Sequence, residues 1–208
     1  MDVAPGGWWY AAAVLAVGVA VTLAFAPLGL LALAGAVGAV CFHRDPSRTV
    51  GDGVVAPADG RVSVVRDEGD RLRVGIYMSA LDVHVNRAPL GGRVTRITRR
   101  EGGHRPAFRK DSDRNERVRV DFEAPEYAVE LVAGAVARRI HPYPSPGEGV
   151  ERGDRIGHIS FGSRADVILP SGVDRGDLAV EVGDRVRAGA TTVARVDDGD
   201  AEGAGGGR

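Results

Sequence analysis

The sequence contains one cysteine and one lysine, and its net charge at neutral pH is only −1. The single Cys41 excludes a disulfide framework and a cysteine metal cluster, and no metal site is expected. Lys110 leaves lysine chemistry with one candidate, in a stretch of mostly polar residues. The near-neutral balance gives no polybasic signal, so a nucleic-acid partner is not expected.

Charge is also absent from a long stretch near the start, because no charged residue occurs between Trp8 and Phe42. About twenty apolar residues span a bilayer as a helix. Pro27 and Gly29 lie near the middle of the stretch, which is compatible with two short helices in a hairpin and with one long kinked helix; a buried soluble hairpin is a further alternative. The start of the chain lacks the positive charge of a secretory signal. Residues 1–43 are therefore predicted to form a membrane anchor.

The residues that flank the apolar stretch indicate its orientation. Aromatic residues begin it, as at a membrane interface, and the preceding segment carries only Asp2 as a charge. Arg44 and Arg48 follow its other end. Because positive residues remain on the cytoplasmic side, we expect a cell-membrane protein whose following domain lies in the cytoplasm.

Residues 44–196 alternate apolar and polar side chains in short runs separated by glycine-containing turns. This pattern predicts a mainly β domain, a sandwich or barrel-like fold. Two Gly-Asp-Arg turns, at 153–155 and 183–185, resemble the hairpins of lipoyl and biotinyl domains but have no lysine to carry a cofactor. Residues 98–116 are predicted to form an exposed loop, and the glycine-rich residues 197–208 a disordered tail.

The Gly162-Ser163 pair in this domain is a candidate functional site. Apolar residues precede and follow Gly162-Ser163, which predicts a strand, a tight glycine turn and a second strand. Glycine permits strained backbone angles and leaves the adjoining carbonyl open to a hydroxyl. An ordinary β-turn would have the same local pattern.

A histidine and an aspartate accompany this serine. His84 lies between two valines, and on a strand it would share one face with Asp82 and Asn86, although a solvated edge strand has the same pattern. Asp59 lies in an Ala-Asp-Gly turn, where aspartate is also common for structural reasons. Serine, histidine and aspartate are the groups of nucleophilic catalysis, but the hydrolase motif Gly-x-Ser-x-Gly is absent.

Four motifs together resemble the phosphatidylserine decarboxylase family, most closely its short form, which includes archaeal archaetidylserine decarboxylases. They are FHRDPSR at 42–48, APADG at 56–60, DVHVNRAP at 82–89 and FGSRADVILP at 161–170, the last being the most specific. They occur in the family's order and span most of residues 42–195.

The resemblance implies a self-cleaving proenzyme. Ser163 would attack the carbonyl of Gly162, and the chain would separate into a β chain, 1–162, and an α chain, 163–208. Ser163 would become a covalent pyruvoyl group, the cofactor, which forms a Schiff base with the substrate amine. Asp59 and His84 match the family's residues for maturation. Some members have a second histidine where this chain has Arg87, so whether His84 also serves decarboxylation stays open.

The implied activity is decarboxylation of a phosphatidylserine-type lipid, diacyl or archaeal diether, to the ethanolamine lipid, with membrane and phospholipid as partners. Two alternatives remain at this level: a membrane-tethered β-sandwich adaptor without catalytic activity, and a membrane serine hydrolase that keeps Ser163 intact. A homo-oligomer is compatible with the decarboxylase and with both alternatives.

Overall fold

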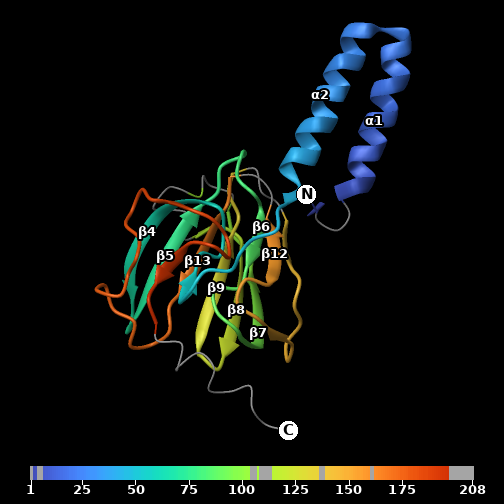
Figure 1. Cartoon of the computed structure of the whole chain (residues 1–208). Helices are drawn as coiled ribbons and strands as arrows, with labels where there is room; N and C mark the ends of the chain where they lie inside the picture. The colour runs from blue at the N-terminus through green and yellow to red at the C-terminus, as the bar shows by residue number, and fades with distance from the viewer. Residues whose placement is uncertain are drawn as a thin grey trace. The chain divides into compact units, whose positions relative to one another are not determined.

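The computed structural model describes residues 2–3, 7–103, 107, 114–135, 139–159 and 162–196 (Figure 1). The chain divides into two compact units, residues 1–47 and 48–208. The first contains two helices, and strands are the main regular elements in the described part of the second. The predicted mainly β domain and the preceding apolar helical segment are confirmed.

The first unit is a helical hairpin, the two-helix form of the apolar segment. Helix α1 covers Gly7–Ala24 and α2 covers Ala26–Phe42, with Pro27 in the first turn of α2, where proline is tolerated. Strands β1 (Asp2–Val3) and β2 (Arg44–Asp45) pair antiparallel and close the hairpin at its base.

Small side chains let the two helices approach closely. A Cβ added at Gly18 would lie 3.3 Å from the Cβ of Ala32, and one at Gly29 would overlap the side chain of Thr22. Thr22 satisfies its hydroxyl by donating to the Gly18 carbonyl at 2.6 Å. Packing through small residues is characteristic of helices in membranes, where no hydrophobic force drives them together.

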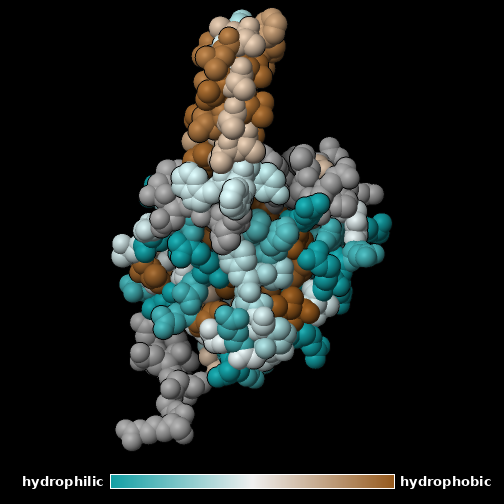
Figure 2. Space-filling model, turned by 90° about the vertical axis from the view of Figure 1, so that its right-hand side faces the viewer, coloured by the Kyte–Doolittle hydropathy of each residue, from teal (hydrophilic) through white to brown (hydrophobic). Residues whose placement is uncertain are grey.

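The large apolar side chains of this unit face outward. Leu23, Leu31 and Trp9 are each at least 70% exposed, and brown covers much of the hairpin surface in Figure 2. By length and composition α1 is able to cross a membrane, since 18 residues rise about 27 Å against a hydrocarbon core of about 30 Å. Helix α2 is apolar and slightly shorter. Such a surface is unusual in water and ordinary in lipid.

The second unit is organised around an eight-stranded antiparallel sheet in the order β11-β7-β8-β9-β13-β5-β4-β14, which curls as half of a barrel (Figure 1). Its strands are β4 (Gly60–Glu68), β5 (Arg71–Tyr77), β7 (Gly92–Arg100), β8 (Arg117–Glu123), β9 (Tyr127–Val132), β11 (Gly149–Val150), β13 (Arg164–Ile168) and β14 (Arg185–Val186). A three-stranded sheet, β10-β12-β6, and the pair β15-β3 complete the unit. These strands are β3 (Val54–Val55), β6 (Val85–Arg87), β10 (Ile140–Pro142), β12 (Arg155–Ile159) and β15 (Thr192–Ala194).

Strand β13 lies inside the large sheet and pairs with β9 on one side and β5 on the other along its whole length. Its alternate residues Ala165 and Val167, and Leu169 directly after it, are fully buried in the hydrophobic core with apolar residues of β5, β8 and β9. Tyr127 belongs to the same core, where burial raises the pKa of its phenol well above the ordinary value; its hydroxyl donates to the Leu90 carbonyl at 2.6 Å.

The two Gly-Asp-Arg turns have the same hydrogen-bond pattern. In the first, Asp154 accepts the N–H of Glu151 at 2.8 Å, and in the second, Asp184 accepts the N–H of Glu181 at 2.8 Å. In both, the glycine has positive φ and the arginine begins a strand, β12 or β14. The internal resemblance noted in the sequence therefore extends to local geometry.

The expectation of an exposed loop over residues 98–116 is wrong at several described positions. Strand β7 continues through Arg100, while Ala107 and Asn115 are buried. Asn115 donates to the Ala133 carbonyl at 2.8 Å, which ties this segment to the end of β9. Arginine-rich composition suggested solvent exposure, but composition does not reveal the burial of Ala107 or the hydrogen bond of Asn115. His104, Arg105 and Arg109 lie outside the described residues.

Candidate active site

The Gly162-Ser163 bend lies between β12, which ends at Ile159, and β13, which begins at Arg164. Gly162 has φ +67°, in the left-handed region that favours glycine. Ser163 is fully buried, and its carbonyl accepts the N–H of Met78 at 2.9 Å. Among the residues that the structure describes, its Oγ has no hydrogen-bond partner. A buried hydroxyl without a partner calls for an explanation such as a catalytic role.

Gly134 packs directly against the peptide between Gly162 and Ser163. A Cβ added at Gly134 would overlap the Gly162 carbonyl oxygen and lie 3.3 Å from the Ser163 nitrogen. Gly134 follows β9, so the absence of a side chain there makes room for this carbonyl. Sequence reasoning missed this residue, since only the pairing of β9 with β13 brings the two glycines together.

His84 is 4% exposed and lies immediately before β6. Its carbonyl accepts the N–H of Ile159 at 3.3 Å, which places it beside the last residue of β12, just before the bend. The expected strand through Asp82, His84 and Asn86 is wrong in its start, and the alternative of a solvated edge strand is contradicted. All three are buried, and the strand begins only at Val85.

Asp82 has a structural task in the turn that precedes His84. One carboxylate oxygen accepts the N–H and the hydroxyl of Ser79 at 2.8 and 2.6 Å, and the other accepts from Arg185 at 2.9 Å. These bonds compete with strand pairing, so the chain turns here and becomes extended only afterwards.

Asp59 lies in the predicted turn, directly before β4. Its Oδ1 accepts the N–H of Ala188 at 2.8 Å, and its Oδ2 accepts from Arg48 at 2.7 Å in an ion pair. A Cβ added at the next residue, Gly60, would overlap the carbonyl of Tyr77, so this turn packs on the end of β5.

The three predicted stretches converge around that end of β5. The Pro57 carbonyl accepts the N–H of Arg87 at 2.9 Å and the side-chain amide of Asn86 at 3.4 Å. The same amide contacts the Met78 sulfur at 3.7 Å, and Met78 in turn binds Ser163. Hydrogen bonds thus connect the Asp59 turn, the His84 segment and the bend. The catalytic roles of these residues stay predictions.

Arg87, which stands where some family members have a second histidine, has a buried side chain. Its Nη1 donates to the Gly153 carbonyl at 3.0 Å. The side chain therefore reaches toward the first Gly-Asp-Arg turn.

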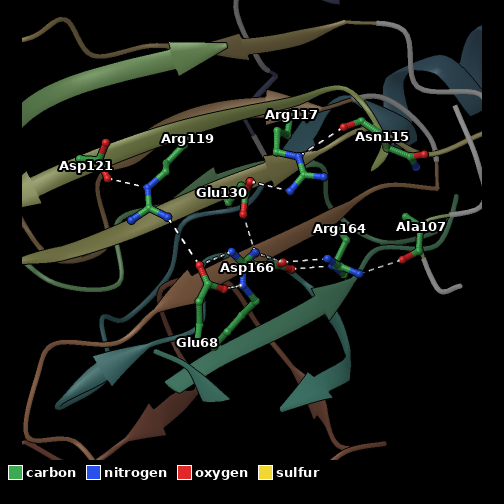
Figure 3. A network of polar contacts seen from close by, with 10 residues as sticks. Glu68, Ala107, Asn115, Arg117, Arg119, Asp121, Glu130, Arg164 and Asp166 are labelled. Atoms are coloured by element: carbon green, nitrogen blue, oxygen red, sulfur yellow. Dashed lines mark hydrogen bonds and ion pairs between the residues drawn. The ribbon is translucent and has the colours of Figure 1, made fainter. Parts of the chain in front are cut away.

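The face of β13 that points away from the hydrophobic core carries a charged cluster that the sequence did not reveal (Figure 3). Arg164 and Asp166 from β13 and Arg73 from β5 meet there, together with Glu130 from β9 and Glu68 from β4. Burial would lower the pKa of Arg73, but its hydrogen bond with Glu68 and the charges of Asp166 and Glu130 raise it above the ordinary value. The hydrogen bond from Arg73 also holds the pKa of Glu68 below its usual value.

Within the described part of the chain, no group of three or more histidine, cysteine, aspartate or glutamate side chains is arranged to hold a metal ion. The three stretches that these hydrogen bonds connect carry a hydroxyl, an imidazole and a carboxylate, those of Ser163, His84 and Asp59. Their chemistry is proton transfer and attack on a carbonyl.

The fold and the bend belong to a known family. Residues 38–194 match the family model described as phosphatidylserine decarboxylase, and the chain belongs to this family. The resemblance inferred from the four motifs is confirmed.

Curated relatives carry names that agree. The chain is 56% identical over 193 residues to a putative archaetidylserine decarboxylase proenzyme of Halobacterium salinarum, covering 92% of this chain and 97% of the relative. It is 51% identical over 164 residues to a phosphatidylserine decarboxylase proenzyme of Streptomyces griseus, covering 77% and 75%. A putative archaetidylserine decarboxylase proenzyme of Methanopyrus kandleri is 42% identical over 212 residues, covering 93% and 98%. No solved structure matches the chain.

Proposed function

We propose that this chain is a proenzyme that cuts itself between Gly162 and Ser163 and then decarboxylates a phosphatidylserine-type lipid, phosphatidylserine or archaetidylserine, to the ethanolamine lipid. The observation that carries the proposal is the fully buried Ser163 hydroxyl, which has no hydrogen-bond partner among the described residues and follows a glycine in the left-handed region. Relatives that share this family are named decarboxylase proenzymes.

The self-cleavage begins with attack of the Ser163 Oγ on the carbonyl carbon of Gly162. The hydroxyl proton goes to a base, the C–N bond breaks, and the product is an ester with a free amine on residue 163. Loss of the Cα proton of residue 163 then expels Gly162 as a carboxylate and leaves a dehydroalanine. Addition of water and release of ammonia convert this residue into a pyruvoyl group at the start of the α chain.

Residues near the bend fit the precursor of that group. Gly134 leaves space for the Gly162 carbonyl, and the Ser163 hydroxyl is not committed to another described residue. His84 is the proposed base, and Asp59, held by Arg48, is the proposed carboxylate that favours the protonated imidazole.

Decarboxylation needs an electron sink and a proton donor. The pyruvoyl carbonyl, once formed, supplies the electron sink for the departing carboxylate of the substrate. His84 would then return a proton to the substrate carbon, a step for which imidazole suits neutral pH. Gly134 and the surrounding buried residues would limit access of water.

The helical unit is proposed to anchor the enzyme in the cell membrane, with residues 44–196 as the catalytic domain and 197–208 as a tail. Its exposed leucines and tryptophans support insertion in lipid, and Arg44 and Arg48 after α2 favour a cytoplasmic domain. At the membrane surface the domain can reach a lipid head group without extracting the acyl chains.

The mass of the purified full-length protein tests this function. We expect two chains, residues 1–162 and a 163–208 chain whose first residue resists Edman degradation, together with release of carbon dioxide from phosphatidylserine or archaetidylserine vesicles. An intact chain that hydrolyses lipid esters would support a serine hydrolase, and an intact chain without activity would support an adaptor. Assays with diacyl and diether substrates in parallel would identify the lipid.

Replacing His84 by alanine is expected to slow maturation by at least about a hundredfold, because general base catalysis contributes roughly 10² to 10⁴. Accumulation of the uncut chain on a denaturing gel measures the effect. His141→Ala is the matched control, since His141 is exposed on β10, and it should mature normally. Normal cleavage of the His84 variant would refute its role.

A further inference from the structure

The backbone of β13 links Ser163 to the charged cluster on its far side. Side chains alternate along a strand, so Arg164 and Asp166 lie on one face while Ala165 and Val167 lie on the other, in the core. Ser163, next to Arg164, belongs on the core side. Any contact that fixes the backbone at Arg164 therefore also restrains the backbone from which the Ser163 side chain projects.

Arg164 is held by two parallel contacts to Asp166. Its Nε donates to Oδ1 at 2.6 Å and its Nη2 to Oδ2 at 2.9 Å, and both side chains are almost completely buried. Such a fork-to-carboxylate pair restrains orientation as well as charge. Gly75 on β5 makes room for it, because a Cβ there would lie 2.7 Å from the Asp166 Oδ1.

Neighbouring strands hold this pair in place. Arg73 donates to the Asp166 Oδ2 at 2.6 Å and forms ion pairs with Glu130 on β9 and Glu68 on β4. The Arg117 Nη1 on β8 contacts the Oε1 of Glu130 at 3.1 Å. Figure 3 shows the contacts running across the sheet to Arg164, which also donates to the Ala107 carbonyl at 3.4 Å. Arg164, the residue that follows Ser163, is therefore part of this network.

Buried ion pairs contribute little net stability compared with apolar side chains of similar volume, so stability alone does not account for this cluster. We propose that the Arg164–Asp166 pair is a positioning device for self-cleavage: it holds residue 164, and with it the Ser163 backbone, in the position from which the hydroxyl attacks the Gly162 carbonyl. This inference rests on the proposed function. Arg164 and Asp166 act through the backbone and do not themselves touch the reacting atoms.

The test compares two arginine-to-lysine changes in the full chain, made by cell-free synthesis with lipid vesicles so that cleavage is followed from the start. Arg164→Lys keeps the charge but loses the double contact, and we expect cleavage at least tenfold slower than wild type. Arg117→Lys makes the same change in the same cluster but two strands away from β13, and we expect cleavage within about twofold of wild type.

Two further measurements separate positioning from folding. In a Ser163→Ala background, which cannot cut itself, Arg164→Lys should melt within a few degrees of the parent. Hydroxylamine cleaves esters and not peptides under mild conditions, so it should fail to rescue Arg164→Lys if the ester does not form. Equal slowing by both lysine variants, slowing that only follows a fall in melting temperature, or full rescue by hydroxylamine would overturn the inference. Failure of the wild type to cut at Gly162 would overturn the proposed function with it.

Discussion

Replacing Ser163 by alanine is expected to leave one inactive chain of 208 residues. In the proposed reaction the Ser163 hydroxyl attacks the Gly162 carbonyl, and the ester that it forms is eliminated to give the dehydroalanine from which the pyruvoyl group is made. Its removal therefore blocks cutting and decarboxylation together. The protein should still fold, because the Oγ makes no hydrogen bond to a described residue. Intact mass and carbon dioxide release from lipid vesicles measure the two losses.

Ser171→Ala is the matched control for this variant. Ser171 is an exposed serine just beyond the other end of β13, and its alanine variant should cut and decarboxylate normally. Cleavage that persists in the Ser163 variant would place the processing site elsewhere in the chain. Cleavage lost from both variants would point to general damage.

Replacing Gly134 by alanine is expected to reduce the rate of maturation by about a hundredfold, the order of loss that a misplacement of about 1 Å can cause. The added methyl group would overlap the Gly162 carbonyl oxygen, a backbone atom that moves only with the bend itself. Overpacking of this kind also costs about 1–3 kcal/mol of stability. The time course of cleavage and a melting curve together measure the effect.

Gly149→Ala provides the comparison. Gly149 lies in β11 with nothing within 4 Å of an added Cβ, and its φ is also outside the left-handed region, so backbone strain is matched. The Gly149→Ala protein should mature at the wild-type rate. If Gly134→Ala also matured at that rate, the position of the Gly162 carbonyl would not depend on the space that Gly134 leaves.

The sequence predicted the parts of the site that are encoded locally. The Gly162-Ser163 bend follows from apolar runs on either side of a glycine, and the Asp59 turn follows from Ala-Asp-Gly. The apolar helical segment was predictable because no charged residue occurs between Trp8 and Phe42. His84 was singled out by its polar spacing, but the strand assigned to it was wrong because Asp82 bonds to Ser79 and Arg185 instead.

The parts that were missed depend on strand register. Gly134 matters only because β9 pairs with β13, and Gly75 only because β5 places it opposite Asp166. Asp166 on its own has the pattern of an ordinary charged residue in a strand. No local pattern distinguishes these residues from other glycines and acids in a chain that contains 30 glycines.

Because β13 lies between β5 and β9, self-cleavage would change how each molecule is able to refold. A cut at Gly162 would sever the chain beside a central strand, whose neighbours on both sides belong to the other fragment. Before the cut, refolding is an event within one chain; afterwards it requires two fragments to meet in solution. The mature protein would then depend on slow unfolding to persist, and a molecule that lost its shorter fragment could not make its cofactor a second time.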